Sequence, residues 1–253
     1  MFNLHTHTYR CNHASGKDEE YVIKAIQNGY GTIGFSDHAP YIFPNGHISS
    51  FRMLPNEAEG YAKSINSLKE KYKGKIDIKL GFELEYYPAL FEKEIEFLKT
   101  FNYDYLILGQ HYTDNEYEDY AAYTGSVTAS QAVLDKYISQ VILGAKSGYY
   151  TYVAHPDLIN FKGDSELYIK KMTYMITELK KIGIPLEFNF LGFTAKRNYP
   201  NLDFWKIVSK VGNNVVIGLD AHNPSVYDDK ENLQKAKQVL QNLNITPLDK
   251  IVL

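Results

Sequence analysis

Residues 1–13 read Met-Phe-Asn-Leu-His-Thr-His-Thr-Tyr-Arg-Cys-Asn-His, and the rest of the chain is organised around this stretch. We expect its first part, Phe2–His7, to form the first strand. Side chains two positions apart on a strand point to the same side, so His5 and His7 can present their imidazoles to one point. His13 follows a short polar segment that can turn it back toward them. Imidazoles grouped in this way favour a divalent transition-metal site, although a His-x-His pair alone is weak evidence.

The bulk composition limits the class of protein. The chain has 253 residues, of which 44% are hydrophobic and 23% charged, and its formal net charge is −3. A single α/β barrel reaches this length. No basic excess indicates a nucleic-acid partner, and no block of charge indicates a disordered tail. One cysteine, Cys11, excludes an internal disulfide and a cysteine-based zinc knuckle.

No targeting or membrane segment is visible in the sequence. The first strand begins close to Met1, without the charged and apolar regions of a signal peptide. No apolar run approaches the ~20 residues that a membrane span requires. We therefore expect a cytoplasmic protein with no membrane partner, and the sequence leaves its oligomeric state open.

Strand-like and helix-like runs alternate seven times along the chain. The predicted strands are Phe2–His7, Gly31–Ser36, Ile76–Leu84, Tyr103–Leu108, Tyr149–Ala154, Pro185–Phe190 and Val215–Leu219. The predicted helices are Lys17–Gly29, Asn56–Tyr72, Ala89–Phe101, Ala129–Lys146, Glu166–Ile182, Leu202–Val211 and Lys230–Leu243. Residues 39–55, 112–127 and 191–200 are predicted as loops.

This alternation implies βαβ units and a parallel sheet. Seven units could form a doubly wound open sheet or a closed barrel. In a barrel the C-terminal ends of all strands meet at one mouth, where (β/α) barrel enzymes hold their sites. In an open sheet, residues at seven strand ends would be strung out in a line. The pattern of candidate ligands therefore favours a barrel, and the absence of a linker or repeat favours one domain over residues 1–253.

Seven of the eight histidines, all but His47, lie at or just beyond the end of a predicted strand. They are His5, His7, His13, His38, His111, His155 and His222, and Glu83 and Asp220 occupy equivalent positions on the third and seventh strands. Each residue alone could be an ordinary polar side chain, a helix cap or the partner of a lysine. Together, seven uncompensated imidazoles would repel one another when protonated and would be costly to desolvate. Two or three closely spaced divalent cations, sharing a bridging carboxylate, would use all nine ligands.

Six short motifs follow one another in an order that resembles a known family. They are His5-Thr-His7-Thr with Cys11-x-His13-Ala, Ser36-Asp-His38, Gly81-Phe-Glu83, Gly109-Gln-His111, Ala154-His155-Pro-Asp157 and Gly218-Leu-Asp220-Ala-His222. The set resembles the motifs of the polymerase and histidinol phosphatase (PHP) superfamily, and its order and spacing look most like the stand-alone histidinol-phosphatase branch. The fourth motif departs from the pattern, because Gly-Gln-His stands where many relatives have Gly-Ser-x-His.

The resemblance implies a distorted, TIM-like (β/α)7 barrel with a metal site at the C-terminal ends of the strands. Carried over motif by motif, it implies a first metal bound by His5, His7, Glu83 and Asp220. Glu83 would bridge to a second metal, held also by His111 and His155. A third metal would be held by His13, His38 and His222. The expected cofactors are two or three zinc, iron or manganese ions.

Three cationic side chains are candidates for binding a phosphate beside the metals. Arg197 follows the sixth strand, Lys162 lies just beyond the fifth, and Arg52 lies in the long second loop. An arginine presents a fork of N–H groups that fits two phosphate oxygens. Each of the three could instead be a solvated loop residue.

The expected function is a metal-dependent phosphomonoesterase. The resemblance favours L-histidinol phosphate as the substrate, in histidine biosynthesis. Water activated by the metals would attack phosphorus, with Arg197 neutralising phosphoryl oxygens. Glu83 would bridge the metals, and Asp220 or His222 could pass protons. Two alternatives remain open: another small phosphoester, such as a nucleotide, sugar phosphate or phosphotyrosine, and a metal-binding barrel without turnover.

Overall fold

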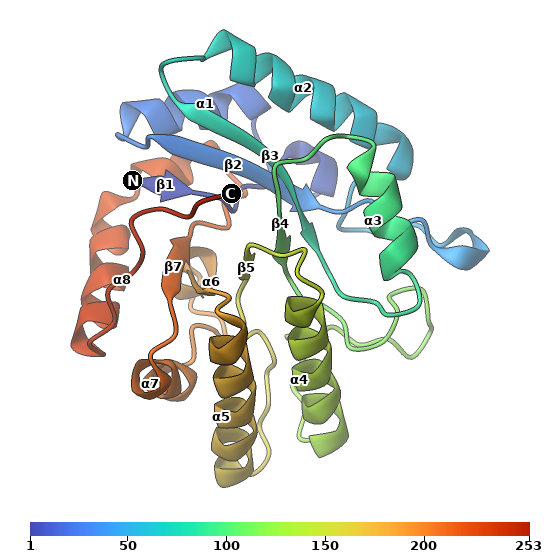
Figure 1. Ribbon diagram of the computed structural model, residues 1–253, viewed down its shortest axis with the longest axis vertical. Helices are drawn as coiled ribbons and strands as arrows, with labels where there is room; N and C mark the ends of the chain where they lie inside the picture. Colours follow the sequence, from blue (N-terminus) through green and yellow to red (C-terminus); the bar gives the residue numbers. More distant parts are fainter.

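Seven parallel strands form one sheet that curls into a nearly closed barrel in the computed structural model, which describes all residues 1–253 (Figure 1). The strands are β1 (Phe2–Asn3), β2 (Thr32–His38), β3 (Asp77–Leu84), β4 (Tyr105–Leu108), β5 (Tyr152–Val153), β6 (Leu186–Asn189) and β7 (Val215–Gly218). Each strand pairs with the next one along the chain, in parallel. A doubly wound sheet would reverse its strand order partway, so the predicted barrel is confirmed.

The barrel closes through residues beside the two end strands rather than through the strands themselves. Thr6 forms an isolated parallel bridge with Ala221. The His7 N–H donates to the Ala221 carbonyl at 2.9 Å, and the Ala221 N–H donates to the His5 carbonyl at 3.1 Å. The Asn3 side chain accepts from the Leu219 N–H at 2.9 Å, in place of a ladder bond. The regular strand is therefore much shorter than the predicted Phe2–His7.

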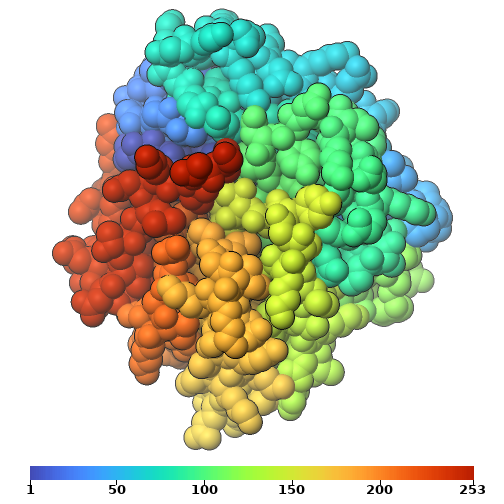
Figure 2. Space-filling model, in the orientation of Figure 1, coloured from blue at the N-terminus to red at the C-terminus, as the bar shows by residue number.

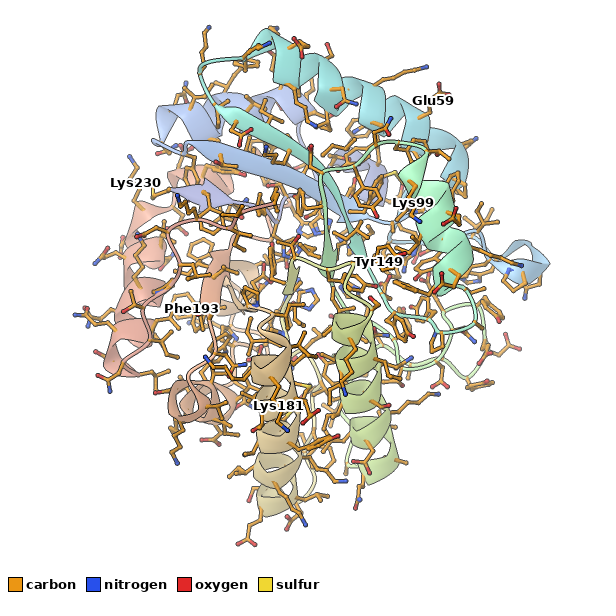
Figure 3. The ribbon with its side chains drawn as sticks, in the orientation of Figure 1. Glu59, Lys99, Tyr149, Lys181, Phe193 and Lys230 are labelled. Atoms are coloured by element: carbon orange, nitrogen blue, oxygen red, sulfur yellow. The ribbon has the colours of Figure 1, made fainter.

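Eight α-helices surround the sheet, and four short 3-10 turns lie in connections between a strand and the helix that follows it. The α-helices are α1 (Asp18–Gln27), α2 (Ala58–Lys71), α3 (Phe91–Lys99), α4 (Gln131–Lys146), α5 (Ser165–Ile182), α6 (Phe190–Thr194), α7 (Leu202–Val211) and α8 (Lys230–Asn242), and the 3-10 turns are η1 (Tyr9–Cys11), η2 (Pro44–Gly46), η3 (Pro55–Glu57) and η4 (Pro224–Asp228). Charged helical side chains such as Lys181 and Lys230 face outward (Figure 3). None of the helices combines the length and apolarity that crossing a membrane requires.

The helix α6 was not predicted from the sequence, which indicated a loop over 191–200. It spans only five residues and follows β6 directly. Its start is capped by Asn189, whose side chain accepts from the Gly192 N–H at 2.8 Å. A helix this short has too few residues to show a helical period, so the pattern could not reveal it.

Apolar side chains fill the barrel interior below the histidines. Six of them form a separate buried cluster: Leu4, Tyr105, Ile107, Tyr152, Ala154 and Val216. The Tyr105 ring fits because Gly34 and Gly81 face it, where added Cβ atoms would approach within 2.3 and 2.5 Å. Leu248 and Ile251 of the C-terminal segment pack against this cluster, and Figure 2 shows that segment beside the N-terminal residues. The barrel is therefore closed at this end.

Glu94 on α3 gives a testable pH dependence of stability. Its side chain is 3% exposed, its Oε1 has no hydrogen-bond partner, and burial raises the pKa of Glu94 to about 7. The folded protein thus holds this proton more tightly than the unfolded chain, and the free energy of unfolding falls as pH rises from about 4.3 through about 7. We expect the difference in free energy of unfolding between Glu94→Gln and wild type to be about 2 kcal/mol more favourable to the variant at pH 8 than at pH 5.

Urea unfolding at the two pH values measures this difference. Glu96→Gln is the matched control, because Glu96 lies on the same helix with its side chain 72% exposed. It should change stability equally at both pH values. Parallel pH profiles for Glu94→Gln and wild type would contradict the prediction.

Candidate metal centre

The nine side chains predicted as metal ligands converge at the C-terminal mouth of the barrel. Glu83 lies on β3, and His38 ends β2 in register with it. The others follow strand ends or the turn η1, in the order His5, His7, His13, His111, His155, Asp220 and His222. The alternation of side chains along a strand explains which of them point inward, since Gly81 and Glu83 on β3 face the same side.

The first group combines two imidazoles and two carboxylates. The Nε2 atoms of His5 and His7 are 3.1 Å apart. The Asp220 Oδ1 lies 3.5 and 3.2 Å from these two nitrogens, and the Glu83 Oε2 lies 3.5 and 3.4 Å from them. The His5 Nδ1 lies 2.7 Å from the Glu187 carboxylate, so it carries the proton and Nε2 offers a lone pair. Burial alone would lower the pKa of His7, but hydrogen bonds to Asp220 and Asp37 raise it to about 9. A cation bound at this point would displace the ring proton, take up the lone pair and face the two carboxylates.

The second group lies on the other oxygen of Glu83. Its Oε1 is 2.8 Å from the His155 Nε2 and 3.7 Å from the His111 Nε2. The His111 Nδ1 lies 2.7 Å from the Glu85 carboxylate, which again leaves Nε2 as the free nitrogen. His155 has φ of 29°, a conformation that residues other than glycine adopt uncommonly. Glu83 thus reaches two groups with its two oxygens, as a bridging ligand would.

The third group pairs His13 with His222, whose Nε2 atoms are 2.9 Å apart. The Nδ1 atom of His13 faces the Cys11 carbonyl at 2.7 Å, and that of His222 faces the Asp220 carbonyl at 3.0 Å. A carbonyl oxygen only accepts, so both rings carry a proton on Nδ1 and turn lone pairs toward each other. This contact is repulsive unless a cation lies between the rings, so the donor set fits a metal.

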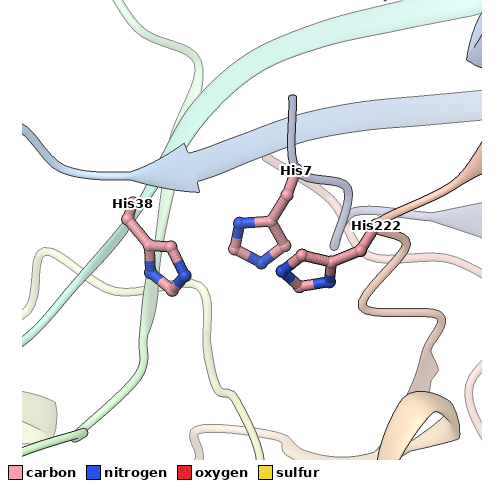
Figure 4. A group of neighbouring side chains, drawn as sticks. All are labelled: His7, His38 and His222. Atoms are coloured by element: carbon pink, nitrogen blue, oxygen red, sulfur yellow. The ribbon is translucent and has the colours of Figure 1, made fainter. Parts of the chain in front are cut away.

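His38, at the end of β2, lies between this group and the first, because its ring stacks on His13 with centroids 5.6 Å apart and its Nδ1 lies 3.1 Å from the Glu83 Oε2. Figure 4 shows His7, His38 and His222 turned toward a common point, and one ring nitrogen from each lies within 4.8 Å of the others. Burial, together with the charge on His7, lowers the pKa of His38 well below its usual range and that of His222 to about 3. Both rings are therefore neutral near pH 7, the state that binds metals.

The two acidic candidates are ionised. Burial alone would raise the pKa values of Glu83 and Asp220, but the surrounding histidines outweigh it and hold both well below their usual range. The Oε2 of Glu83 has no hydrogen-bond partner, although it is buried. A buried anionic oxygen without a donor is costly, and a bound cation would remove the cost.

Several residues that support the candidate ligands escaped the sequence analysis, and Glu187 is the most important. It is fully buried on β6, where it contacts His5 and accepts from the His155 N–H at 2.9 Å. Asn189, two residues on, donates to Asp220 at 3.1 Å. Gly218 leaves room, since a Cβ there would lie 1.6 Å from the Glu187 carboxylate. The sequence signal that could have revealed Glu187 is an ionisable residue inside the otherwise apolar strand predicted over 185–190.

A cavity of about 440 Å³ opens above these groups. Seven of the nine candidate ligands line it, whereas His5 and His7 lie beneath them. Its other walls include Arg197, Tyr199, and an aromatic side formed by Phe51, Tyr112 and Tyr123. A larger hollow of about 600 Å³ lies between the N-terminus, α8 and residues 244–249, but no histidine lines it. The ligand geometry, not the size, identifies the mouth as the candidate site.

The three cations predicted to contact phosphate have different surroundings. Arg197 lies at the exposed rim of the cavity and donates to the Tyr199 hydroxyl at 2.7 Å. Lys162 is exposed and does not line the cavity. Arg52 is buried, and its five N–H groups all donate to protein acceptors. Arg52 therefore has no free donor, and of the three cations Arg197 alone lines the cavity.

Comparison with known proteins identifies the family. Residues 3–190 match the model of the PHP domain. The chain belongs to the PHP domain family. Its resemblance to that family is therefore confirmed.

Relatives of this PHP domain protein cover nearly all of it. It is 27% identical to the probable histidinol-phosphatase of Deinococcus radiodurans, over 88% of this chain and 87% of the relative. It is also 27% identical to the histidinol-phosphatase of Bacillus subtilis, over 86% of this chain and 92% of the relative. The crystal structure of histidinol phosphate phosphatase from Lactococcus lactis has the same fold, with a TM-score of 0.74 and 19% identity, covering 99% and 96% of the two chains.

The geometry predicts the metal content. We expect two or three divalent cations per chain, and we expect Glu83→Gln to weaken two sites together, because a neutral amide bridges two cations poorly. Equilibrium dialysis against buffered Zn²⁺ or Mn²⁺, followed by elemental analysis, measures both quantities. Glu178→Gln on α5 is a control that should leave metal content unchanged. One cation or none in the wild type, or the loss of a single site in Glu83→Gln, would contradict the prediction.

Proposed function

We propose that this PHP domain protein is a metal-dependent phosphomonoesterase whose favoured substrate is L-histidinol phosphate. The observation that carries the proposal is the convergence of nine candidate ligands beneath a cavity with Arg197 at its rim. The relatives named histidinol-phosphatase support the substrate, at 27% identity. The Lactococcus lactis structure, which contains zinc, L-histidinol and phosphate, supports the metal and the ligand class.

The proposed ligand sets follow the three groups of side chains. His5, His7, Glu83 and Asp220 would hold one cation. His111 and His155 would hold a second, with Glu83 bridging the two. His13, His38 and His222 would hold a third. The two oxygens of Glu83 support this bridging role, because Oε2 lies 3.5 and 3.4 Å from His5 and His7 and Oε1 lies 2.8 and 3.7 Å from His155 and His111.

The side chains of this protein would position the ester and move its protons. Bound divalent cations supply a water of lowered pKa and neutralise phosphoryl oxygens. Arg197 would hold the phosphoryl group through its fork of N–H groups, with its guanidinium oriented by the Tyr199 hydroxyl. Asp220 and His222 both line the cavity, with Oδ1 and Nδ1 3.3 Å apart, and either would first have to accept the proton of the attacking water before passing it to the departing alkoxide.

The shape of the cavity supports a small substrate. Its volume of about 440 Å³ lies within the range of small-molecule sites. Phe51 and Tyr112 lie nearly parallel, with ring centroids 6.0 Å apart, and Phe51 also packs edge-on against His38 and His111, at 5.1 and 5.7 Å between centroids. An aromatic wall of this kind suits an ester whose alcohol carries a planar ring, as histidinol does.

Arg197→Ala tests the phosphate contact. We expect KM to rise and kcat/KM to fall. The fall should correspond to a loss of roughly 2–4 kcal/mol of transition-state stabilisation, which is typical of removing one preorganised hydrogen-bond donor. Metal content should be unchanged. Lys196→Ala is the matched control, because it removes an exposed positive charge from the same loop and does not line the cavity. A loss below about threefold would assign Arg197 to the solvated rim.

A comparison of substrates tests the specificity. With one metal, kcat/KM is measured for L-histidinol phosphate, p-nitrophenyl phosphate, phosphotyrosine and a nucleoside monophosphate. We expect histidinol phosphate to be preferred by at least about a hundredfold, or ~2.7 kcal/mol of differential transition-state binding. A preference for another ester would overturn the substrate and leave the phosphoesterase. No turnover of any ester, with metals bound, would favour a non-catalytic barrel.

A further inference from the structure

A buried charge cluster lies behind the wall of the cavity, with Arg52 at its centre. Arg52 is 2% exposed, and its guanidinium makes five hydrogen bonds. Two go to Glu85, at 3.2 and 3.0 Å, and two go to one oxygen of Glu116, at 3.1 and 2.5 Å. The fifth goes to the Ala39 carbonyl, at 2.9 Å. Every N–H group of the side chain is thus used inside the protein.

These bonds tie together three segments that are distant in sequence. Arg52 belongs to the loop 39–55, Glu85 follows the end of β3, and Glu116 belongs to the loop 112–127. Neither loop contains an α-helix or a strand. Both contribute to the cavity, the first through Phe51 and the second through Tyr112 and Tyr123. A single guanidinium therefore holds both loops against a strand end of the barrel.

The cluster reaches the candidate metal centre along a continuous path. The same Glu85 oxygen that accepts from Arg52 at 3.0 Å lies 2.7 Å from the His111 Nδ1. That contact sets which nitrogen of His111 is free and which way its ring faces. On its other side, the guanidinium carbon lies 4.4 Å from the centre of the Phe51 ring, in a cation–π contact. Both His111 and Phe51 line the cavity.

We propose that Arg52 is a positioning residue that acts through Glu85 to hold His111 in its metal-binding orientation and that fixes Phe51 as a wall of the cavity. The proposal rests on the proposed function for its kinetic consequence, but its consequence for metal binding is independent of the substrate. It assigns Arg52 a role without contact to phosphate.

Only arginine can fill this role at this position. The bonds to Glu85 and Glu116 use the planar fork, and the bond to Ala39 uses a donor on the same plane. A lysine keeps the charge, but its single ammonium cannot reach both carboxylates in that geometry. An apolar residue would leave two buried carboxylates, Glu85 and Glu116, without a counter-charge.

The test is a metal titration of Arg52→Lys. Affinity for Zn²⁺ is measured on the folded, metal-stripped chain by competition with a chelator. We expect one class of site to weaken by about 10–100-fold while the remaining sites keep their affinity, as typically follows the loss of a residue that orients a metal-bound histidine. With the phosphoester that wild type hydrolyses most efficiently, Arg52→Lys should have a lower kcat. It should also have a higher KM, because Phe51 would be displaced from the cavity wall.

A double-mutant cycle tests the path through Glu85. If Arg52 acts on His111 through Glu85, Arg52→Lys should weaken zinc binding much less in a Glu85→Gln background than in wild type. Additive effects of the two substitutions on zinc affinity would overturn the proposal. Wild-type zinc affinity in every site of Arg52→Lys would overturn it as well.

Leu179→Ala separates positioning from a general loss of stability. Leu179 is fully buried on α5, away from the cavity, and its truncation destabilises the fold without touching the cluster. We expect Leu179→Ala to bind zinc as wild type does. If it weakens the same class of site as Arg52→Lys, the effect comes from stability and the positioning role falls. If no phosphoester is turned over but the zinc results hold, the proposed function fails and the positioning role stands.

Discussion

Glu83 is the centre on which the rest of the structure depends. Its two carboxylate oxygens lie within 3.7 Å of five imidazoles, from His5, His7, His38, His111 and His155. A buried carboxylate among so many rings is costly unless each oxygen faces a positive partner, and Oε2, which has no hydrogen-bond partner, would gain one from a bound cation. The backbone makes room for it, because a Cβ at position 109 would lie 2.0 Å from its Oε1, and that residue is glycine. The fold therefore shapes strands β3 and β4 around one charged side chain.

The barrel meets this constraint by dividing its interior into layers. Alternation along the strands puts apolar groups such as Tyr105 and Ile107 below, and the ionisable groups above them at the strand ends. A further set of carboxylates lies around the histidines, and Glu187 and Glu85 each fix one ring nitrogen as a donor. Asp220 and His155 also adopt positive φ, at 50° and 29°. Such backbone is tolerated where the surroundings over-determine it, as they do here.

The strand ends and the loops contribute different properties to the site. Strand ends hold the candidate ligands, which decide the class of chemistry. The loops 39–55, 112–127 and 191–200 supply Phe51, Tyr123 and Arg197, which line the cavity above the candidate ligands. Loops tolerate substitution and insertion better than strands do, so a barrel of this kind can keep its chemistry while its substrate changes. This division separates the two parts of the proposed function, because the proposed reaction class rests on the candidate ligands and the proposed substrate rests on the loops.

The sequence by itself determined the features that depend on local pattern and on residue chemistry. Helical spacing predicted Leu202–Val211 with the bounds that the structure has, and ligand-type residues at strand ends predicted which side chains would meet. Only the tertiary structure decided the partners. Residues 5 and 187 are brought together by the closing of the barrel, and Arg52 meets Glu116 because two loops fold over one strand end. A local pattern carries no information on contacts between segments so far apart, and a buried charge takes its role from the groups that surround it. For that reason the sequence indicated Arg52 as a cation available to bind phosphate, whereas in the fold all of its N–H groups donate to protein acceptors.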